Sequence, residues 1–231
     1  MTVAAVIVAA GRGVRMRAGR PKAFVRVGGE TLLERSVRAF ASHPRIGRIV
    51  VAVADPPEAA RVLGPLAERV VLVHGGADRQ ESVRAGLGAI PEKDADIVLV
   101  HDAARPLVAR DLVDAVIEAA GEGGAAVPAT VPTSTVKRVA EDGRVEETVP
   151  RDRLRLAQTP QGFLAPILRQ AHAVAAQDGF VGTDDAALVE RTGRSVRVVE
   201  GSPENIKITT PLDLLLAEAI LEHRARGGKG G

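Results

Sequence analysis

The chain has 231 residues, of which 45% are hydrophobic and 26% charged, with a formal net charge of +2 at pH 7. These values are typical of a globular protein with a buried core. The scattered charge and the 2% of aromatic residues, with no Trp or Tyr, argue against a nucleic-acid-binding protein. The sequence has no cysteine, which excludes disulfides, thiolate nucleophiles and cysteine metal ligands and is typical of a cytoplasmic protein.

No apolar run reaches the about 20 residues that a membrane-spanning helix needs. The first apolar segment, 3–8, has no basic residues before it and leads directly into a glycine-rich loop. We therefore interpret this segment as a β-strand, not as a signal peptide. No repeat or internal linker interrupts residues 1–226, which predicts a single domain, and the glycine-rich tail 227–231 is predicted to be disordered.

Short β-branched runs alternate with helical patterns in the first half of the chain. Continuous apolar runs, typical of strands buried on both faces of a parallel sheet, predict strands at 3–8, 48–53, 70–73 and 97–100. Helical patterns predict helices at 31–40, 81–90 and 111–120, the first opened by a Thr31–Glu34 capping box and the last closed by Gly121, Gly123 and Gly124. This alternation predicts a Rossmann-like three-layer α/β sandwich with a mostly parallel sheet.

The pattern changes in the second half. Residues 136–139 and 145–149 flank an Asp142-Gly143 turn and predict a β-hairpin, within an arm at about 134–154. Because this hairpin is highly charged and has little to bury, we expect it to project from the domain and to contact a second subunit. The remaining expected elements are helices at 166–177, 184–191 and 211–226 and strands at 196–199 and 206–208.

A glycine-rich loop with several basic residues follows the first strand, over residues 9–22. Small residues let backbone N–H groups approach phosphate oxygens, and ligands of open α/β sheets bind at this end of the strands. The loop therefore favours a polyphosphate site, with a plain tight turn as the alternative. A dinucleotide fingerprint fails because Met16 stands at its third small position, although Asp55 after the second strand keeps a nicotinamide oxidoreductase as a distant alternative.

Three further features fall at the predicted strand ends. Asp102 follows the fourth strand, where a carboxylate favours a hard cation that bridges phosphates, or else caps a turn; His101 beside it is interpreted as a packing residue. The Gly75-Gly76 pair and Ser82 follow the third strand and favour a base or ribose contact, with a solvated loop as the alternative. Lys207 alternates with apolar neighbours, so it projects to the opposite face, toward a phosphate or solvent.

The sequence shows no Ser–His–Asp set and no metal-ligand spacing among its five histidines. Chemistry that depends on a protein nucleophile is therefore not favoured, whereas chemistry that needs only positioning and charge neutralisation is.

Six motifs occur in register: AAGRGVRM with Pro-Lys at 9–22, GGADRQESVRAGL at 75–87, VHDAARP at 100–106, QTPQ at 158–161, TDD at 183–185 and NIKITTPLDL at 205–214. Together they make the chain resemble the 2-C-methyl-D-erythritol 4-phosphate cytidylyltransferase family of the non-mevalonate isoprenoid pathway, from residue 3 to about residue 219. The resemblance implies transfer of CMP from CTP to a polyol phosphate with release of pyrophosphate. It also implies Mg²⁺ or another divalent cation and a homodimer that exchanges its arms.

The resemblance further implies roles for single residues. Arg15 and Lys22 would hold the triphosphate and stabilise the transition state, Lys207 would contact the α-phosphate, and Asp102 would face the metal. Cytosine and ribose would be bound by Ala9, Ala10, Gly11, Gly13, Gly75, Arg79, Ser82 and Ala103. The acceptor would be bound by Arg151, Thr159, Thr135 and Thr183, with Arg151 acting on the neighbouring subunit's site.

Two positions depart from the family pattern: Glu204 stands where Asp is usual before Asn-Ile-Lys, and Arg153 places a second arginine beside Arg151. A ribitol 5-phosphate cytidylyltransferase would use the same chemistry on another acceptor, although the Ala103-Ala104 pair favours methylerythritol. From another class, an inactive nucleotide-binding or arm-mediated interaction module is the alternative, and the retained charged residues argue against it.

Overall fold

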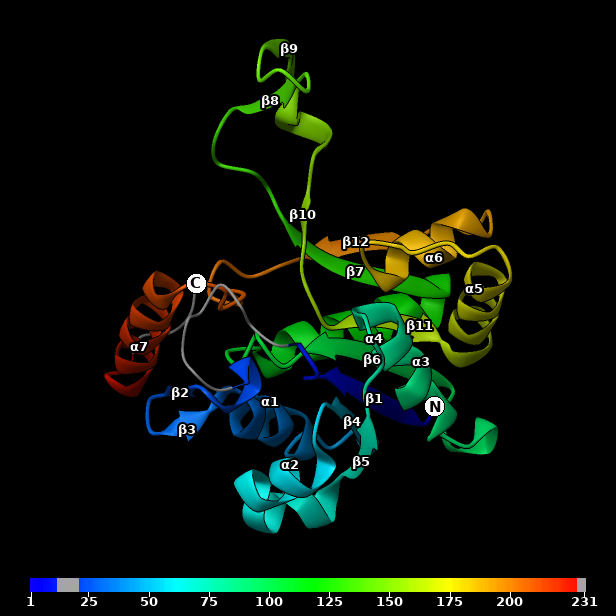
Figure 1. The fold of residues 1–231 in the computed structure, drawn as a ribbon, viewed down its shortest axis with the longest axis vertical. Helices are drawn as coiled ribbons and strands as arrows, with labels where there is room; N and C mark the ends of the chain where they lie inside the picture. The colour runs from blue at the N-terminus through cyan, green and yellow to red at the C-terminus, as the bar shows by residue number, and fades with distance from the viewer. Residues whose placement is uncertain (12–20, 228–231) are drawn as a thin grey trace.

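The computed structural model describes residues 1–11 and 21–227. Within these residues an eight-stranded sheet has the order β10-β7-β11-β6-β1-β4-β5, with β12 paired to β7 (Figure 1). Its strands are β1 (Val3–Val8), β4 (Ile46–Val53), β5 (Val71–His74), β6 (Ile97–Asp102), β7 (Ala125–Thr130), β10 (Leu156–Ala157), β11 (Gln161–Leu164) and β12 (Arg197–Glu200). The central pairs are parallel, whereas β11 is antiparallel to both β6 and β7. The predicted, mostly parallel sheet is confirmed.

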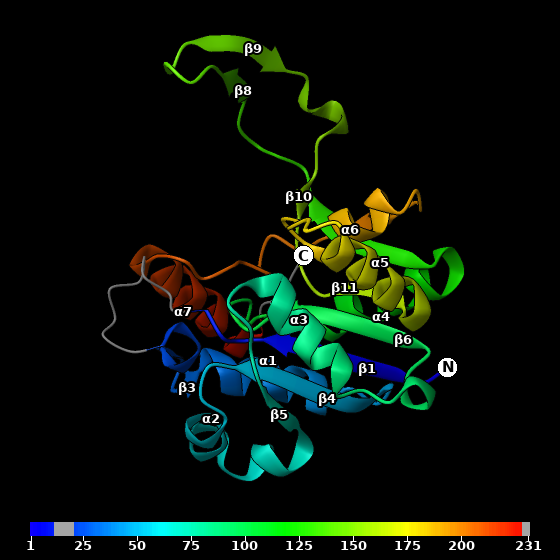
Figure 2. The same ribbon diagram turned by 45° about the vertical axis from the view of Figure 1, so that its right-hand side comes forward.

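Helices cover both faces of this sheet (Figure 2). Helices α1 (Leu32–Ala41), α2 (Pro56–Leu63) and α4 (Arg110–Gly123) pack on one face, and α3 (Arg79–Gly88), α5 (Ala165–Gln177) and α6 (Asp185–Arg191) on the other. The buried strand β1 supplies Ala5 and Ile7 to the first core and Ala4 and Val6 to the second, as the side-chain period of two requires. This arrangement confirms the predicted three-layer sandwich.

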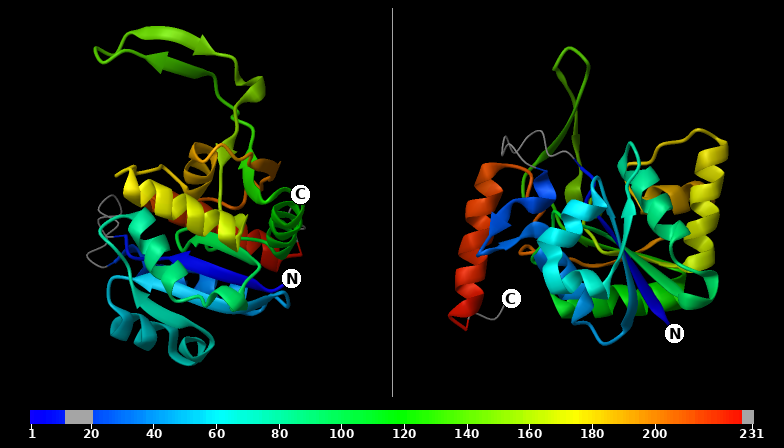
Figure 3. Two further views of the ribbon diagram at one scale, coloured as in Figure 1. Left: turned by 90° about the vertical axis from the view of Figure 1, so that its right-hand side faces the viewer. Right: turned by 60° about the horizontal axis from the view of Figure 1, so that its bottom comes forward.

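A third, smaller core lies beside the sandwich. Helix α7 (Pro211–Ala225) packs on a two-stranded ribbon made of β2 (Arg26–Val27) and β3 (Glu30–Thr31), and Figure 3 shows the pair at the edge of the molecule. The ribbon directly follows the short 3₁₀ helix η2 (Lys22–Phe24). Helix α7 therefore packs both against the ribbon that follows Lys22 and against the segment that carries Lys207.

Helix ends follow the expected chemistry with one correction. The Thr31 side chain accepts a hydrogen bond from the Glu34 backbone, and the Glu34 carboxylate accepts one from the Thr31 N–H, so the predicted capping box is confirmed. Gly121, expected to close the helix before it, instead lies within α4, which runs to Gly123. The helix ends at Gly124 because this residue adopts a left-handed conformation with φ of 86°.

The strand expected at 206–208 is not formed. Residues 201–210 have no ladder partner, and the Ile208 N–H donates a single 2.8 Å hydrogen bond to the Ala104 carbonyl. The apolar alternation that suggested a strand reflects packing of Ile206 and Ile208 into the third core.

The predicted hairpin is confirmed as β8 (Val136–Val139) and β9 (Val145–Val149), which project far from the sandwich (Figure 1). Its apolar residues are not buried in this chain, since Val139 is 55% and Val145 58% exposed. Among the described residues, no helix combines the length and the apolar character needed to cross a membrane.

Candidate active site

A cavity of about 230 Å³ opens at the carboxyl ends of the parallel strands. It is bounded by the end of β1, the loop between β5 and α3, the end of β6 and the segment before α7. Its lining consists of Val8, Ala9, Ala10, Gly11, Lys22, Ala23, Leu32, Gly76, Ala77, Asp78, Arg79, Ser82, Asp102, Ala103, Ala104 and Lys207.

The cavity gathers most of the predicted nucleotide-site residues. Nine of them line it: Ala9, Ala10, Gly11, Lys22, Arg79, Ser82, Asp102, Ala103 and Lys207. Arg15 and Gly13 lie outside the described residues, so their predicted roles stay predictions. Gly76 of the recognised glycine pair also lines the cavity, as do Ala77 and Asp78, which directly follow the pair and were assigned no role from the sequence.

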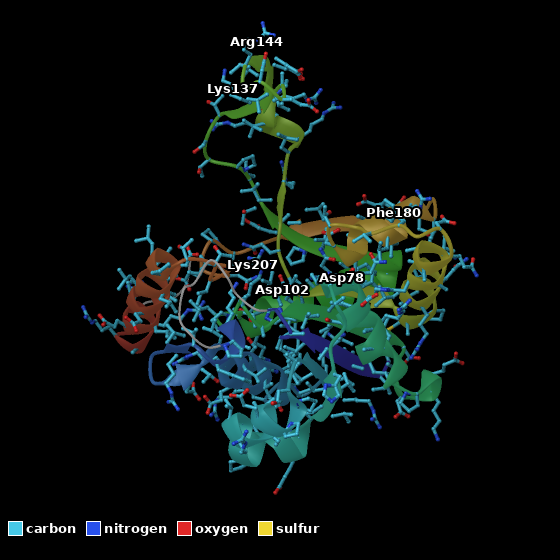
Figure 4. All side chains as sticks on the ribbon, in the orientation of Figure 1. Asp78, Asp102, Lys137, Arg144, Phe180 and Lys207 are labelled. Atoms are coloured by element: carbon cyan, nitrogen blue, oxygen red, sulfur yellow. The ribbon has the colours of Figure 1, made fainter. Side chains whose placement is uncertain are left out.

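Asp102 is the charged centre of the cavity. Its carboxylate accepts a hydrogen bond from Arg79 Nε at 3.0 Å and pairs with Lys207 Nζ at 2.7 Å, and Figure 4 shows Asp102 beside Lys207. Burial alone would raise the pKa of the Asp102 carboxyl, but Arg79 and Lys207 outweigh it and hold that pKa well below its ordinary value. The carboxylate is therefore ionised at neutral pH.

Arg79 connects this centre to a buried pair that the sequence reasoning did not assign. Its Nη1 donates to Asp185 at 2.7 Å, and Asp185 also pairs with His172 Nε2 at 2.9 Å. Burial opposes the charge of Arg79, but Asp185 and Asp102 outweigh this effect and raise the pKa of the guanidinium. The TDD motif at 183–185 was the sequence signal for Asp185, but only Thr183 of that motif was assigned a role from the sequence.

Ser82 lines the cavity, whereas Gly75, also a predicted nucleotide-site residue, packs against Ala10 of the lining. A Cβ atom on Gly75 would lie 2.4 Å from the Cβ of Ala10, so the close approach of these two segments requires glycine. The Ser82 hydroxyl donates to the Asp78 carbonyl at 2.8 Å and accepts from the Gly76 N–H at 3.1 Å. In this structure Ser82 therefore orders the loop, and its predicted contact with a base or ribose stays a prediction.

His101 and Thr159 lie behind Asp102. The His101 ring packs 4.8 Å from the Phe40 ring, in agreement with its interpretation as a packing residue, and burial lowers its pKa to about 4. Because Nε2 of the neutral ring faces the Arg105 carbonyl at 3.1 Å, Nε2 carries the proton and Nδ1 accepts from the Thr159 hydroxyl. The hydroxyl oxygen accepts in turn from the Asp102 N–H at 3.1 Å. Thr159 thus faces the Asp102 backbone and does not line the cavity.

The other predicted acceptor residues lie apart from the cavity of their own subunit. Thr135 and Arg151 belong to the arm, where Arg151 Nη1 donates to the Thr133 carbonyl. Thr183 is exposed in the loop before α6. Figure 4 shows Lys137 and Arg144 near the arm tip, remote from Asp102 and Lys207. None of the three predicted residues lines the cavity.

Asp102 fits a divalent cation whose other ligands are supplied by substrate phosphates and water. The described residues contain no group of three or more acidic or histidine side chains suited to hold a metal. A carboxylate has about four lone-pair sites, so Asp102 retains acceptor capacity beside its two cationic partners. Mg²⁺ is commonly bound by one or two carboxylates together with substrate phosphates and water, and this donor set fits that pattern.

The fold and the cavity define an α/β nucleotide-binding protein whose charged groups meet at the carboxyl edge of the sheet. The family model described as IspD: 2-C-methyl-D-erythritol 4-phosphate cytidylyltransferase matches residues 3–223. The chain belongs to this family.

Individual relatives agree over nearly the whole length. A 2-C-methyl-D-erythritol 4-phosphate cytidylyltransferase of Saccharopolyspora erythraea is 48% identical over 226 residues, covering 96% of this chain and 100% of that protein. One from Symbiobacterium thermophilum is 45% identical, covering 97% and 94%. The crystal structure of the Thermus thermophilus enzyme of the same name superimposes with a TM-score of 0.79 at 43% identity, covering 96% of this chain and 100% of that chain.

Proposed function

We propose that this protein transfers CMP from CTP to 2-C-methyl-D-erythritol 4-phosphate, giving 4-diphosphocytidyl-2-C-methyl-D-erythritol and pyrophosphate. Family membership supports this reaction. The observation that carries the chemistry is the meeting of Lys22, Arg79, Asp102 and Lys207 in one cavity at the sheet edge. Residues 1–226 act as one nucleotidyltransferase domain in this proposal.

The reaction is a direct in-line displacement at the α-phosphorus of CTP. The acceptor phosphate is already an anion at neutral pH, so it needs no general base. The obstacle is repulsion between two anions, and a cation about 4 Å from a phosphate offsets it by about 4 kcal/mol at an effective dielectric constant of 20. Lys207 at the α-phosphate, with Lys22 and Arg15 along the triphosphate, supplies this charge.

Asp102 and Arg79 order the centre of the site. Asp102 would hold a divalent cation, Mg²⁺ in this proposal, which supplies charge neutralisation between the phosphates. Arg79, fixed between Asp102 and Asp185, keeps the Asp102 carboxylate ionised and oriented. Backbone groups of the small residues 9–11 and 75–77 read the base, since the residue pattern leaves little aromatic surface for stacking.

The acceptor site is completed by a second subunit. The arm carries Thr135 and Arg151 away from its own cavity, and its apolar residues Val139 and Val145 are exposed in the single chain. We place these arm residues at the neighbouring subunit's site in a homodimer, where they bind the acceptor phosphate together with Thr183. Thr159, whose hydroxyl is bonded to His101 and to the Asp102 N–H, would act there only by holding the Asp102 backbone.

Mixed dimers test the arm exchange. Arg151→Ala and Lys22→Ala parents are each expected to lose most activity, while a mixed dimer isolated through two different affinity tags has one intact site and regains about half of the wild-type rate. If Arg151 served its own subunit, both sites of the mixed dimer would carry one defect, and the mixed dimer would stay as inactive as its parents. A monomeric wild type in sedimentation would also contradict the exchange.

The function itself is tested by pyrophosphate release with CTP and a panel of polyol phosphates. We expect turnover with 2-C-methyl-D-erythritol 4-phosphate and much less with ribitol 5-phosphate, UTP or ATP. A preference for ribitol 5-phosphate would reassign the acceptor, and absence of turnover with every acceptor would favour a binding module.

A further inference from the structure

Lys207 reaches Asp102 from a segment that is not a strand of the sheet. Residues 201–210 form no strand, yet Lys207 Nζ lies 2.7 Å from the Asp102 carboxylate. Holding a charged group at a reacting phosphate requires rigid support, because a displacement of about 1 Å can cost a hundredfold in rate. The part of the segment around Lys207 must therefore be fixed by contacts other than a strand ladder.

Helix α7 supplies much of this support along its length. Ile206 and Ile208 belong to the third core together with Leu214, Ala217 and Leu221 of α7. Side chains alternate along an extended segment, so Lys207 points away from α7, toward Asp102. The segment thus lies along the helix with its lysine on the cavity side.

The two ends of this segment are tied to the two ends of α7. At its end, Thr210 forms a capping box with Asp213 in the first turn of the helix. At its start, Glu204 binds Arg224 in the last turn through Nε at 2.7 Å and Nη2 at 2.6 Å. Nη2 of Arg224 also donates to the Leu107 carbonyl at 3.1 Å, just after the VHDAARP motif.

The segment returns along α7 between these two attachments. Glu204 lies in a turn at 203–204, residues 206–209 follow without regular structure, and Thr210 caps the helix whose last turn carries Arg224. The Glu204 carboxylate contacts both Nε and Nη2 of Arg224 through its Oε2 atom.

We propose that Arg224 is a positioning residue for Lys207: through its ion pair with Glu204 it holds segment 204–210 along α7 and fixes the lysine at Asp102. The link to catalysis rests on the proposed function, whereas the link to the position of the segment does not. Asn205 is held separately by bonds to Thr159 and Arg105, so loss of Arg224 loosens the segment without releasing it.

Arg224→Met tests the proposal because methionine keeps an apolar stem and removes the hydrogen bonds to Glu204 and to the Leu107 carbonyl. We expect faster hydrogen exchange of the amides in 204–210, including the Ile208 amide that bonds to Ala104, and a fall of about tenfold in kcat. The KM for CTP should change less than kcat. Arg226→Met is the matched control, since within residues 1–11 and 21–227 the Arg226 side chain pairs only with Glu222, at 3.2 Å on the exposed end of the same helix. Both readouts should remain at the wild-type level.

A Lys207→Ala background separates positioning of the lysine from general damage. There, Arg224→Met should lower kcat no further, because the group that it positions is gone. Unchanged exchange of 204–210 in Arg224→Met would overturn the proposal whatever the reaction is. An equal loss of kcat with and without Lys207 would overturn it too, while wild-type inactivity with faster exchange would refute only the proposed function.

Discussion

Replacing Lys22 with alanine is expected to lower kcat about a thousandfold without unfolding the protein. Lys22 lines the cavity at the start of η2, beside the small residues at the end of β1. One charge close to a phosphate contributes about 4 kcal/mol at an effective dielectric constant of 20, and each 1.36 kcal/mol corresponds to about a tenfold change in rate. Pyrophosphate release under saturating CTP measures the loss, and the thermal midpoint of unfolding measures the fold.

The matched control is Lys93→Ala, which removes the same charge at the opposite end of the sheet. Its turnover should equal that of the wild type. Near-normal turnover in Lys22→Ala would show that the lysine does not face the triphosphate. A large drop in thermal midpoint would show instead that its role is structural.

Replacing Arg79 with methionine is expected to produce the largest loss of stability. The guanidinium lies between Asp102 and Asp185, and the Asp185 side chain is only 1% exposed. Removing one partner of a buried ion pair typically costs about 3–5 kcal/mol in the free energy of unfolding, because a charge remains buried without compensation. Chemical denaturation at neutral pH measures this loss. A cost below about 1 kcal/mol, typical of exposed pairs, would contradict the buried network.

The loss should depend on pH in a definite direction. Burial alone would raise the pKa of the Asp185 carboxyl, but His172 and Arg79 outweigh it and hold that pKa below its ordinary value. The pKa of Asp102 is held down against burial in the same way. These interactions therefore stabilise the fold above the unfolded carboxyl pKa of about 3.9 and are lost as pH falls through the lower folded values. Without Arg79 both carboxylates protonate more readily, so the difference between variant and wild type should shrink below about pH 4.

A second replacement identifies the carboxylate responsible. Arg79→Met combined with Asp185→Asn removes the buried charge together with its partner, so part of the lost stability should return. Additive losses in the double variant would assign the cost to packing.

The sequence predicted the strands that are buried on both faces. The runs 3–8 and 97–100 are continuous and apolar, so their pattern alone specifies a central strand. Strand β7 was missed because Ala125–Thr130 is rich in alanine and contains Pro128, both unfavourable to strand formation. Its position depends on pairing with β11 and β12, which are distant in sequence.

The same limit applies to the site. Asp102 follows a recognisable strand and Lys22 belongs to the glycine-rich loop after another, so their convergence at the carboxyl edge of the sheet was predictable. Lys207 lines the same cavity, although the strand expected around it is not formed. The partners of Arg79 were not, because Asp185 lies 106 residues away and its role depends on how α6 packs against the sheet. The contact of Glu204 with Arg224 was also not predictable from the sequence, because the two residues are 20 positions apart and meet only because α7 packs back along segment 204–210.

The most direct test of the central claim is the stereochemistry at the α-phosphorus, measured with CTP in which sulfur replaces one nonbridging α-oxygen. In this account fixed positive groups let two anions react in a single in-line step, and such a step inverts the configuration at the α-phosphorus. Retention would show two successive displacements through a nucleophile on the protein and would contradict the account.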